Sequence, residues 1–281
     1  MQLVHTQVEL DAALAAARVA GQKIGFVPTM GALHAGHVSL VDLAETYSDL
    51  VVVSIFVNPK QFGAGEDFDR YPRTLDADCA LLEGRADIVF APAVEDVYPP
   101  NLEVAAKQAG PVGSLFEGAA RPGHFDGMLT VVARLFDMVR PGIAVFGEKD
   151  AQQLFLVRQL AAAEYPGLQV IGAEIVREPS GLAMSSRNRY LNSEQLDIAE
   201  ILAITLATVS ELVHDGTPVE SALALGEAMI TGEPETKLDY LALVDPRTFE
   251  RVGNGFTGTA LLIVAAVVGG VRLIDNHQFQ I

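Results

Sequence analysis

The sequence predicts an α/β protein, in which a Rossmann-like, doubly wound parallel sheet forms an N-terminal domain and a smaller α+β domain follows. Two observations predict this class. In the first half of the chain, short apolar runs alternate with segments of helical spacing, which is typical of parallel strands joined by right-handed helical crossovers. After residue 176 the alternation stops, and long helical segments precede further apolar runs. The expected domains are therefore residues 1–176 and 177–281.

The N-terminal domain contains apolar runs that are typical of strands buried on both faces. They cover residues 24–27, 50–57, 87–91, 143–147 and 169–176. Helical spacing occupies the intervals between them, at residues 37–46, 76–85, 125–139 and 151–165. In a sheet of this kind, ligands bind beyond the carboxyl ends of the strands, so the residues that follow each run are the first candidates for a site.

The C-terminal domain begins with a polar loop, after which Asn192 and Gln195 have the spacing of a capping box. We expect one long helix after this box and a second helix near residues 219–230. Strand-like runs follow at residues 238–244 and 260–273. The apolar stretch 260–271 contains a Gly-Gly pair and is too short to cross a bilayer, so it predicts one or two buried strands.

The composition limits the partners that the protein can have. The chain has 281 residues, with 36 acidic and 19 basic side chains and a formal net charge of −17. This balance argues against nucleic-acid binding, because neutralising phosphates requires an excess of Lys and Arg. The single cysteine, Cys79, excludes an intrachain disulfide, and the N-terminus lacks the pattern of a secretory signal. We expect a cytoplasmic protein with no membrane or nucleic-acid partner.

The stretch VPTMGALHAGH, which begins at Val27, joins the first predicted strand to the first predicted helix. Its glycines permit a close approach of the backbone to a ligand, and the N-terminus of the following helix favours an anion. His34 and His37 lie three residues apart, so they face the same way on the first helical turn. The stretch has the sequence form of a phosphate site, although it is neither a dinucleotide-binding fingerprint nor a P-loop.

The two histidines have three interpretations. In the first, one caps the helix and the other packs. In the second, they hold a metal, but zinc needs a third protein ligand, and the remaining histidines are scattered without ligand spacing. In the third, both imidazoles contact phosphates, where N–H donors stabilise the charge that develops at phosphorus. The missing third ligand disfavours the metal, and the sequence favours phosphate handling.

Two basic clusters support this interpretation. The stretch FGEKDAQQL places Lys149 just past a predicted strand, where ligands lie, although the stretch alone also fits an exposed capping turn. At the domain boundary, GLAMSSRNR offers serine hydroxyls and the guanidinium groups of Arg187 and Arg189, which suit phosphate oxygens. In so acidic a chain, gathered basic residues indicate where anions bind.

A cluster of neutral amides follows the second predicted strand in SIFVNPKQF. Asn58 and Gln61 stand at a ligand-facing strand end and suit a polyhydroxy acid. Without its neighbours, the same stretch would pass for a long surface loop.

Together these stretches resemble the pantothenate synthetase (pantoate–β-alanine ligase) family of nucleotidyltransferases. PTMGALHAGH is similar to the HIGH motif, and MSSRN stands where relatives carry a KMSKS-type loop. FVNPKQF, YPRT, RPGHF, FGEKD, GLAMSSRNRYL and RLIDN follow the family patterns in the expected order, from about residue 22 to the end. The combination is much more specific than the HIGH-like motif alone.

The resemblance implies a reaction in two steps. ATP and pantoate form pantoyl adenylate and pyrophosphate, and β-alanine then attacks the adenylate to give pantothenate and AMP. It also implies a homodimer and a requirement for Mg²⁺, for which no protein ligand can be assigned, so that the ATP phosphates would chiefly hold the ion. In RPGHFDG, Asp126 stands where relatives often have a basic or neutral residue, which leaves its effect on a nearby anion open.

The resemblance also assigns residues. His37 would be the proton donor toward the leaving phosphate, with His34 and Lys149 beside it as catalytic residues. Gln61 and Gln153 would bind pantoate, with Asn58 in the same pocket, and Gln61 would also lie near β-alanine. The ATP site would comprise Met30, Gly31, Ala32, Leu33, His34, Ala35, Gly36, His37, Gly147, Glu148, Lys149, Asp150, Val176, Met184, Ser185, Ser186 and Arg187.

Two alternatives remain at this point. A nucleotidyltransferase that stops at a nucleotidyl product would use the same motifs of the first half, but it would not need the amide pocket or a second domain able to close over an adenylate. A non-catalytic nucleotide sensor would bind ATP without turnover and would have no use for two histidines.

Overall fold

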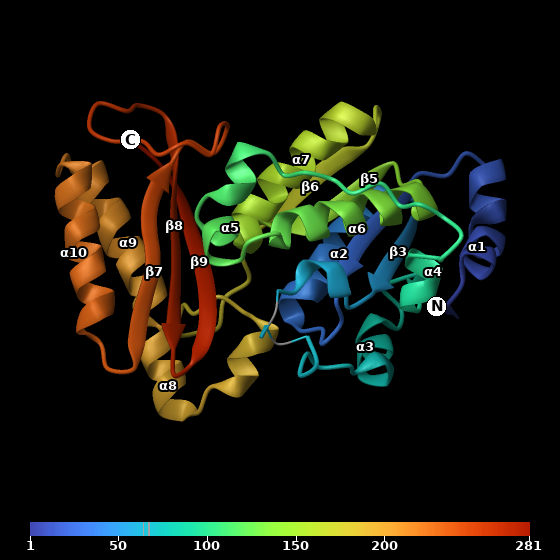
Figure 1. Cartoon of the computed structure of the whole chain (residues 1–281), viewed down its shortest axis with the longest axis horizontal. Coiled ribbons are helices and arrows are strands. Elements are labelled where there is room, and N and C mark those ends of the chain that lie inside the picture. Colours follow the sequence, from blue (N-terminus) through green and yellow to red (C-terminus); the bar gives the residue numbers. More distant parts are fainter. Residues whose placement is uncertain (64, 67) are drawn as a thin grey trace. The chain divides into compact units, whose positions relative to one another are not determined.

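The computed structural model describes residues 1–63, 65–66 and 68–281 (Figure 1). The chain divides into two compact units. Unit 1 comprises Met1–Glu148 and Leu156–Glu174, and unit 2 comprises Lys149–Phe155 and Ile175–Ile281. The division therefore groups residues 149–155 with the second unit, whereas the sequence boundary assigned them to the domain 1–176.

The described part of unit 1 is built on a six-stranded parallel sheet in the order β1-β4-β3-β2-β5-β6. Its strands are β1 (Gln2–Val4), β2 (Ile24–Thr29), β3 (Leu50–Ile55), β4 (Ile88–Phe90), β5 (Ile143–Gly147) and β6 (Gln169–Ala173). The predicted fold class and the five predicted strands are confirmed, while β1 is an additional edge strand. The chain winds outward from β2 in one direction and from β5 in the other, so the topological switch point lies between β2 and β5.

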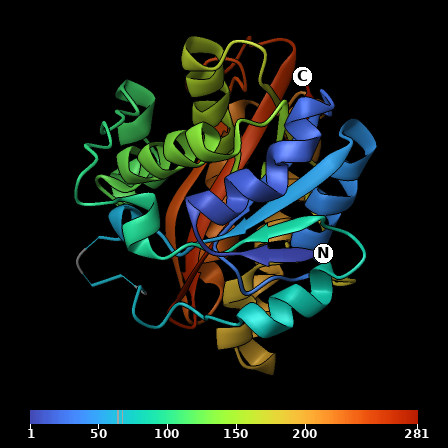
Figure 2. The same cartoon turned by 90° about the vertical axis from the view of Figure 1, so that its right-hand side faces the viewer.

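Helices cover both faces of this sheet (Figure 2). The helices within residues 1–174 are α1 (Gln7–Val19), α2 (Ala35–Tyr47), α3 (Leu75–Leu82), α4 (Val94–Val97), α5 (Glu117–Ala120), α6 (His124–Val139) and α7 (Ala151–Glu164), with 3₁₀ turns η1 (Pro59–Gln61), η2 (Pro111–Ser114) and η3 (Glu148–Asp150). Val27 and Val41 belong to the core on the α2 side, whereas Phe26 packs its ring against Phe136 of α6 on the other side, 6.2 Å away. Alternate residues of β2 are thus buried on opposite faces, as the apolar runs predict.

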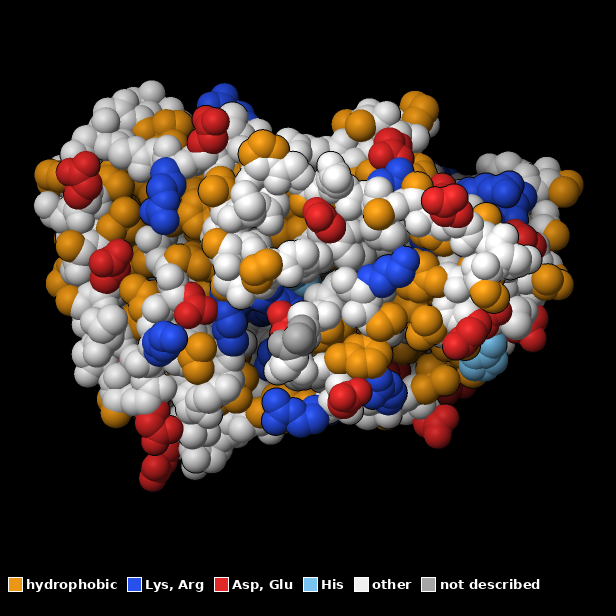
Figure 3. Space-filling model, viewed as in Figure 1, with side chains coloured by type: hydrophobic (Ala, Val, Ile, Leu, Met, Phe, Trp, Pro, Cys, Tyr) orange, Lys and Arg blue, Asp and Glu red, His pale blue; other side chains and the backbone are white. Residues whose placement is uncertain are grey.

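The acidic side chains outnumber the basic ones, but they do not form a face of one charge in the view of Figure 3. Acidic and basic side chains are interspersed on the face shown in Figure 3. Among residues 1–63, 65–66 and 68–281, none of the helices has the length and apolar character needed to span a bilayer.

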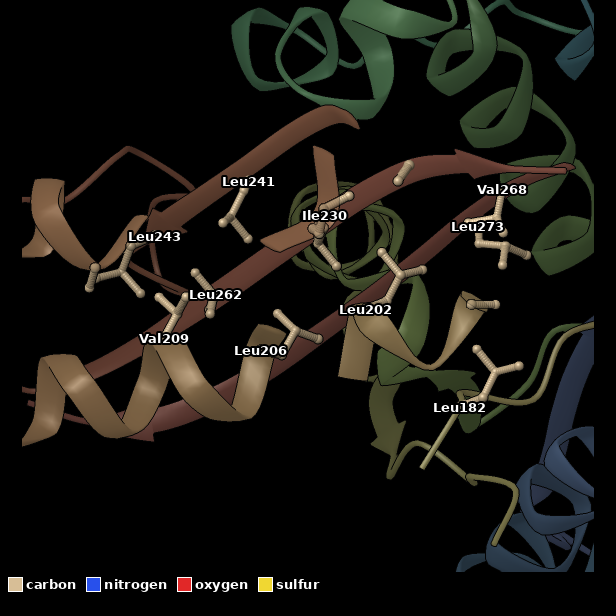
Figure 4. Packing of buried hydrophobic residues seen from close by; sticks show 14 of the residues in the cluster. Leu182, Leu202, Leu206, Val209, Ile230, Leu241, Leu243, Leu262, Val268 and Leu273 are labelled. Atoms are coloured by element: carbon tan, nitrogen blue, oxygen red, sulfur yellow. The ribbon is translucent and has the colours of Figure 1, made fainter. Parts of the chain in front are cut away.

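Unit 2 packs helices on an antiparallel sheet in the order β7-β8-β9. Its elements are η4 (Ser186–Tyr190), α8 (Ser193–Ala199), α9 (Ile201–His214), α10 (Val219–Gly232), β7 (Thr236–Val244), β8 (Thr259–Val268) and β9 (Val271–Gln280). Figure 4 shows Leu206 and Val209 of α9 directed toward Leu262 of β8, within the core of this unit.

Two expectations for unit 2 are refined by the structure. The apolar run at 260–273 is a hairpin, because Gly269 and Gly270 both have positive φ (56° and 82°) and form a two-residue turn. The single long helix expected after Asn192 is divided into α8 and α9 at Glu200, whose N–H bonds back to Asp197 O at 3.3 Å in a tightened turn.

Candidate active site

The switch point of unit 1 lies where β2 ends at Thr29 and β5 ends at Gly147. The chain leaves β2 through residues 30–34 and enters α2, whose N-cap is His34. In an open parallel sheet, the crevice beyond these carboxyl ends is where ligands bind. The position in unit 1 that favours a ligand is therefore occupied by the stretch VPTMGALHAGH, together with Gly147 and Glu148.

The loop between β2 and α2 is held by a buried carboxylate. Asp78 of α3 is 1% exposed, and it accepts hydrogen bonds from the backbone N–H groups of Ala32 (3.1 Å) and Leu33 (2.8 Å). Thr74 Oγ1 donates to the same carboxylate at 3.2 Å. Gly31 and Ala32 both have positive φ, 80° and 52°. Glycine adopts this conformation readily, but it costs energy at Ala32, which has a Cβ, so the loop needs support. The sequence assigns no role to Asp78, which lies 45 residues after Leu33 in the chain.

His34 and His37 form a reciprocal cap at the start of α2. The backbone N–H of Gly36 donates to His34 Nδ1 at 3.1 Å, and the backbone N–H of His34 donates to His37 Nδ1 at 3.3 Å. A ring nitrogen that accepts a hydrogen bond carries no proton, so the neutral form of each imidazole carries its proton on Nε2. The ring centroids are 4.2 Å apart.

The capping role expected of one histidine is thus shared by both. It does not exclude phosphate handling, because capping uses Nδ1, and the proton of each neutral ring is on Nε2, which is a hydrogen-bond donor. Among the residues that the structure describes, no group of three or more His, Cys, Asp or Glu side chains is arranged to hold a metal ion.

The amides of Asn58 and Gln61 belong to one hydrogen-bonded network. Asn58 is 1% exposed, and its Nδ2 donates to Gln61 Oε1 and to Gly127 O, both at 3.1 Å. Its Oδ1 accepts from Tyr98 Oη (2.9 Å) and from the backbone N–H of Lys60 (3.2 Å). Gln61 is held through Oε1, and its Nε2 lies 3.2 Å from Met30 Sδ. Because Oε1 accepts from Asn58, the N–H groups of Gln61 Nε2 point away from Asn58, and one of them donates to Met30 Sδ.

Tyr98 is a residue of this network that sequence reasoning missed. Burial raises the pKa of its phenol well above the ordinary value, so the hydroxyl stays protonated and donates to Asn58. Its distance along the chain from Asn58 leaves no spacing signal by which the sequence could reveal the contact.

Unit 2 contains the other candidate residues, Lys149, Asp150, Gln153, Val176 and residues 184–187. Asn276 Nδ2 donates to the backbone carbonyl of Lys149 at 3.0 Å. Ser185 caps η4, accepting at Oγ from the backbone N–H of Arg187 at 3.2 Å. These contacts fix the backbone from which the side chains of Lys149 and Arg187 extend.

The RLIDN segment supports the domain-boundary loop within unit 2. Arg177 makes a forked contact to Asp275, with Nη1–Oδ2 at 2.6 Å and Nη2–Oδ1 at 3.0 Å. Arg177 Nη1 also donates to Gly181 O at 3.0 Å, and Asp275 is 3% exposed. Sequence reasoning used RLIDN only as a family signature, and the structure shows that it anchors the loop preceding Met184.

Known proteins resemble this chain over nearly its whole length. The sequence pattern described as pantoate-beta-alanine ligase matches residues 2–278. The pantothenate synthetase of Leifsonia xyli subsp. xyli is 48% identical over 280 residues, covering 100% of this chain and 97% of that protein. A crystal structure of pantothenate synthetase from Thermus thermophilus superposes with a TM-score of 0.92 at 46% identity, covering 99% of each chain.

A second solved structure is that of the pantoate-beta-alanine ligase from Francisella tularensis, which was complexed with Beta-gamma ATP and β-alanine. It has a TM-score of 0.78 and 34% identity, and the match covers 99% of this chain and 97% of that one. From the family pattern and these relatives together, the chain belongs to the pantoate–β-alanine ligase family.

Proposed function

We propose that this protein joins pantoate to β-alanine at the expense of ATP, through a pantoyl-adenylate intermediate. In the first step, a pantoate carboxylate oxygen attacks the α-phosphorus of ATP, and the bond to the β-phosphate oxygen breaks to release pyrophosphate. In the second, the amine of β-alanine attacks the activated carbonyl, the bond to AMP breaks, and the nitrogen loses a proton. The product is pantothenate, and no nucleophilic side chain is needed.

The observation that carries this proposal is the pair of imidazoles at the switch point with Nδ1 occupied by backbone donors. Their Nε2–H groups, together with the N-terminus of α2, suit the negative charge that develops on phosphate oxygens. We assign His37 as the proton donor toward the leaving phosphate, with His34 as its neighbour. We also assign Lys149 and Arg187 to the same ATP, as the resemblance to the family implies.

The acid is assigned to the amide network. We assign Gln61 and Gln153 to pantoate, and Gln61 also to β-alanine. Since Oε1 of Gln61 accepts from Asn58, its Nε2 is the group suited to donate to a carboxylate or hydroxyl oxygen of the acid. Asn58 uses both donors and both acceptor positions within the protein, which supports a role in holding Gln61.

Magnesium is proposed to arrive with ATP. The described residues include no group of three or more His, Cys, Asp or Glu side chains able to hold a metal, and the proposal requires no such group. Phosphate oxygens are ligands that Mg²⁺ prefers. From the family alone, we also propose that the enzyme is a cytoplasmic homodimer. Analytical ultracentrifugation of the purified protein tests the oligomeric state.

Exchange of labelled pyrophosphate into ATP tests the proposed function. With Mg²⁺ present and β-alanine absent, we expect exchange that depends on added pantoate. Exchange without pantoate would favour a nucleotidyltransferase that uses another acceptor, and ATP binding with no exchange would favour the sensor. Addition of β-alanine should then stop net exchange and yield pantothenate and AMP in equal amounts.

A further inference from the structure

The stretch RPGHFDG has no role in the function proposed above, yet its residues contact the amide network directly. It contains Arg121, the N-cap Gly123 and the first turn of α6. His124 is 8% exposed, its Nδ1 lies 2.9 Å from the backbone carbonyl of Gln61, and its Nε2 lies 3.2 Å from Arg121 Nη1. The ring therefore connects α6 to η1 on one side and to a guanidinium on the other.

These two contacts define the tautomer of His124. A carbonyl oxygen only accepts, so Nδ1 carries the proton that is donated to Gln61 O. A guanidinium only donates, so Nε2 must be the unprotonated, accepting nitrogen. Arg121 is itself oriented by Glu66, through Nε–Oε1 at 3.0 Å and Nη2–Oε2 at 2.6 Å. The imidazole is thus neutral and constrained at both nitrogens.

The same turn of α6 approaches η1 closely at Gly127. A Cβ built on Gly127 would lie 2.0 Å from the carbonyl oxygen of Lys60 and 2.9 Å from Gln61 Cα. Only glycine permits this approach, and its own carbonyl accepts from Asn58 Nδ2. One helical turn therefore contacts the Gln61 backbone through His124 and the Gln61 side chain through Asn58.

We propose that neutral His124 is a positioning residue for Gln61, holding it in the orientation that binds pantoate. The inference rests on the proposed contact between Gln61 and pantoate. It assigns to RPGHFDG the support of the acid-binding residue, and it requires the Nδ1-protonated, neutral form of the ring.

The surroundings of His124 favour that form. The charged groups that face it are Arg121, Glu117 and Glu66. Burial and the Arg121 cation lower the pKa of His124, while the hydrogen bond to Gln61 and the two carboxylates oppose this shift. A proton added at low pH would place an N–H on Nε2 against the Arg121 donor, so acid should disrupt the network and weaken pantoate binding.

Two substitutions separate the two nitrogens. In His124→Asn, the amide N–H can replace Nδ1–H and donate to Gln61 O. In His124→Gln, the amide group reaches the position of Nε2, toward Arg121, and the donor to Gln61 O is lost. We expect His124→Gln to raise the KM for pantoate about tenfold, as loss of one buried hydrogen bond does, with the KM for ATP changed less than about twofold. His124→Asn should stay within about threefold of the wild type.

His5→Gln is a matched control, because His5 Nδ1 makes the same kind of contact to a backbone carbonyl, that of Ala91, at 2.8 Å, just past the edge strand β1. It should leave both KM values unchanged. Gln61→Ala separates the two levels of the proposal. If it does not raise the KM for pantoate, the placement of Gln61 is wrong; if it does and His124→Gln does not, the role of His124 is wrong.

A pH profile provides a readout that does not require His124→Gln to fold. The KM for pantoate of the wild type should rise as the pH falls below the ordinary histidine value of about 6.5, and this acid limb should be reduced in His124→Asn. Equal profiles in the two proteins, or equal effects of the Asn and Gln substitutions, would overturn the proposal.

Discussion

The Asp78 carboxylate accepts a 2.8 Å hydrogen bond from the backbone N–H of Leu33, the residue before His34. The two residues are 45 positions apart in the chain and both are buried. Through this contact, α3 fixes the loop that ends in the two histidines. The geometry of the proposed phosphate site thus depends on a residue outside the stretch VPTMGALHAGH.

Asp78→Asn tests this dependence. An amide keeps one oxygen and presents an N–H to the other backbone donor, so one charge-assisted hydrogen bond becomes unfavourable. We expect the free energy of unfolding to fall by about 1–3 kcal/mol and pyrophosphate exchange to slow. Urea unfolding and the exchange assay measure the two effects. Asp76→Asn, at an exposed position in the same helical turn, should change neither; a matching loss there would point to the helix N-terminus rather than to the loop.

Gly31→Ala tests the conformation of the loop. The residue has a φ of 80°, and a Cβ would lie 3.0 Å from both Asp78 Oδ2 and Ile55 Cγ2. Left-handed strain and the close contact should together lower the free energy of unfolding by about 1–3 kcal/mol. Gly21→Ala has similar strain, at a φ of 67°, but no atom within 4 Å. Only Gly31→Ala should also slow exchange, and equal activity of the two variants would show that the loop tolerates displacement.

Arg177→Lys tests the anchor of the boundary loop in unit 2. Lysine cannot reproduce the forked contact to Asp275, whose side chain is 1% exposed, so we expect a loss of about 1–3 kcal/mol in the free energy of unfolding. Arg247→Lys is the matched substitution in a forked pair with Asp245 whose arginine side chain is 80% exposed, and it should have little effect. Thermal unfolding of both variants measures the two effects. An equally small loss of stability in both would show that the contact between Arg177 and Asp275 does not anchor the loop.

The sequence predicts the parts of this protein that depend on local pattern. The central strands are apolar on both faces, as Phe26 and Val27 illustrate, and they are found at the expected positions. The edge strand β1 escaped prediction because its three residues include only one that is buried. The division between α8 and α9 at Glu200 was not predicted, because no glycine or proline marks it in the sequence.

The sequence suggests candidate site residues, but it does not reveal the contacts that hold them. A strand end followed by Asn58 and Gln61 suggests two amides facing a ligand. In the structure, the Asn58 amide instead donates a hydrogen bond to the Gln61 amide. Asp78, Tyr98 and His124 act on candidate residues through contacts between segments far apart in the chain. Such contacts depend on how strands and helices pack, and no periodicity of the sequence records them.

The most direct test of the central claim compares His37→Asn with His37→Gln in pantoate-dependent pyrophosphate exchange. Asparagine can keep an acceptor for the backbone N–H of His34 but has no group at Nε2, whereas glutamine carries an amide N–H near that position. If Nε2–H acts on phosphate, His37→Asn should slow exchange by about two to four powers of ten, and His37→Gln should remain at least about tenfold faster than it. Exchange at the wild-type rate by a folded His37→Asn enzyme would contradict the claim and leave His37 as a helix cap.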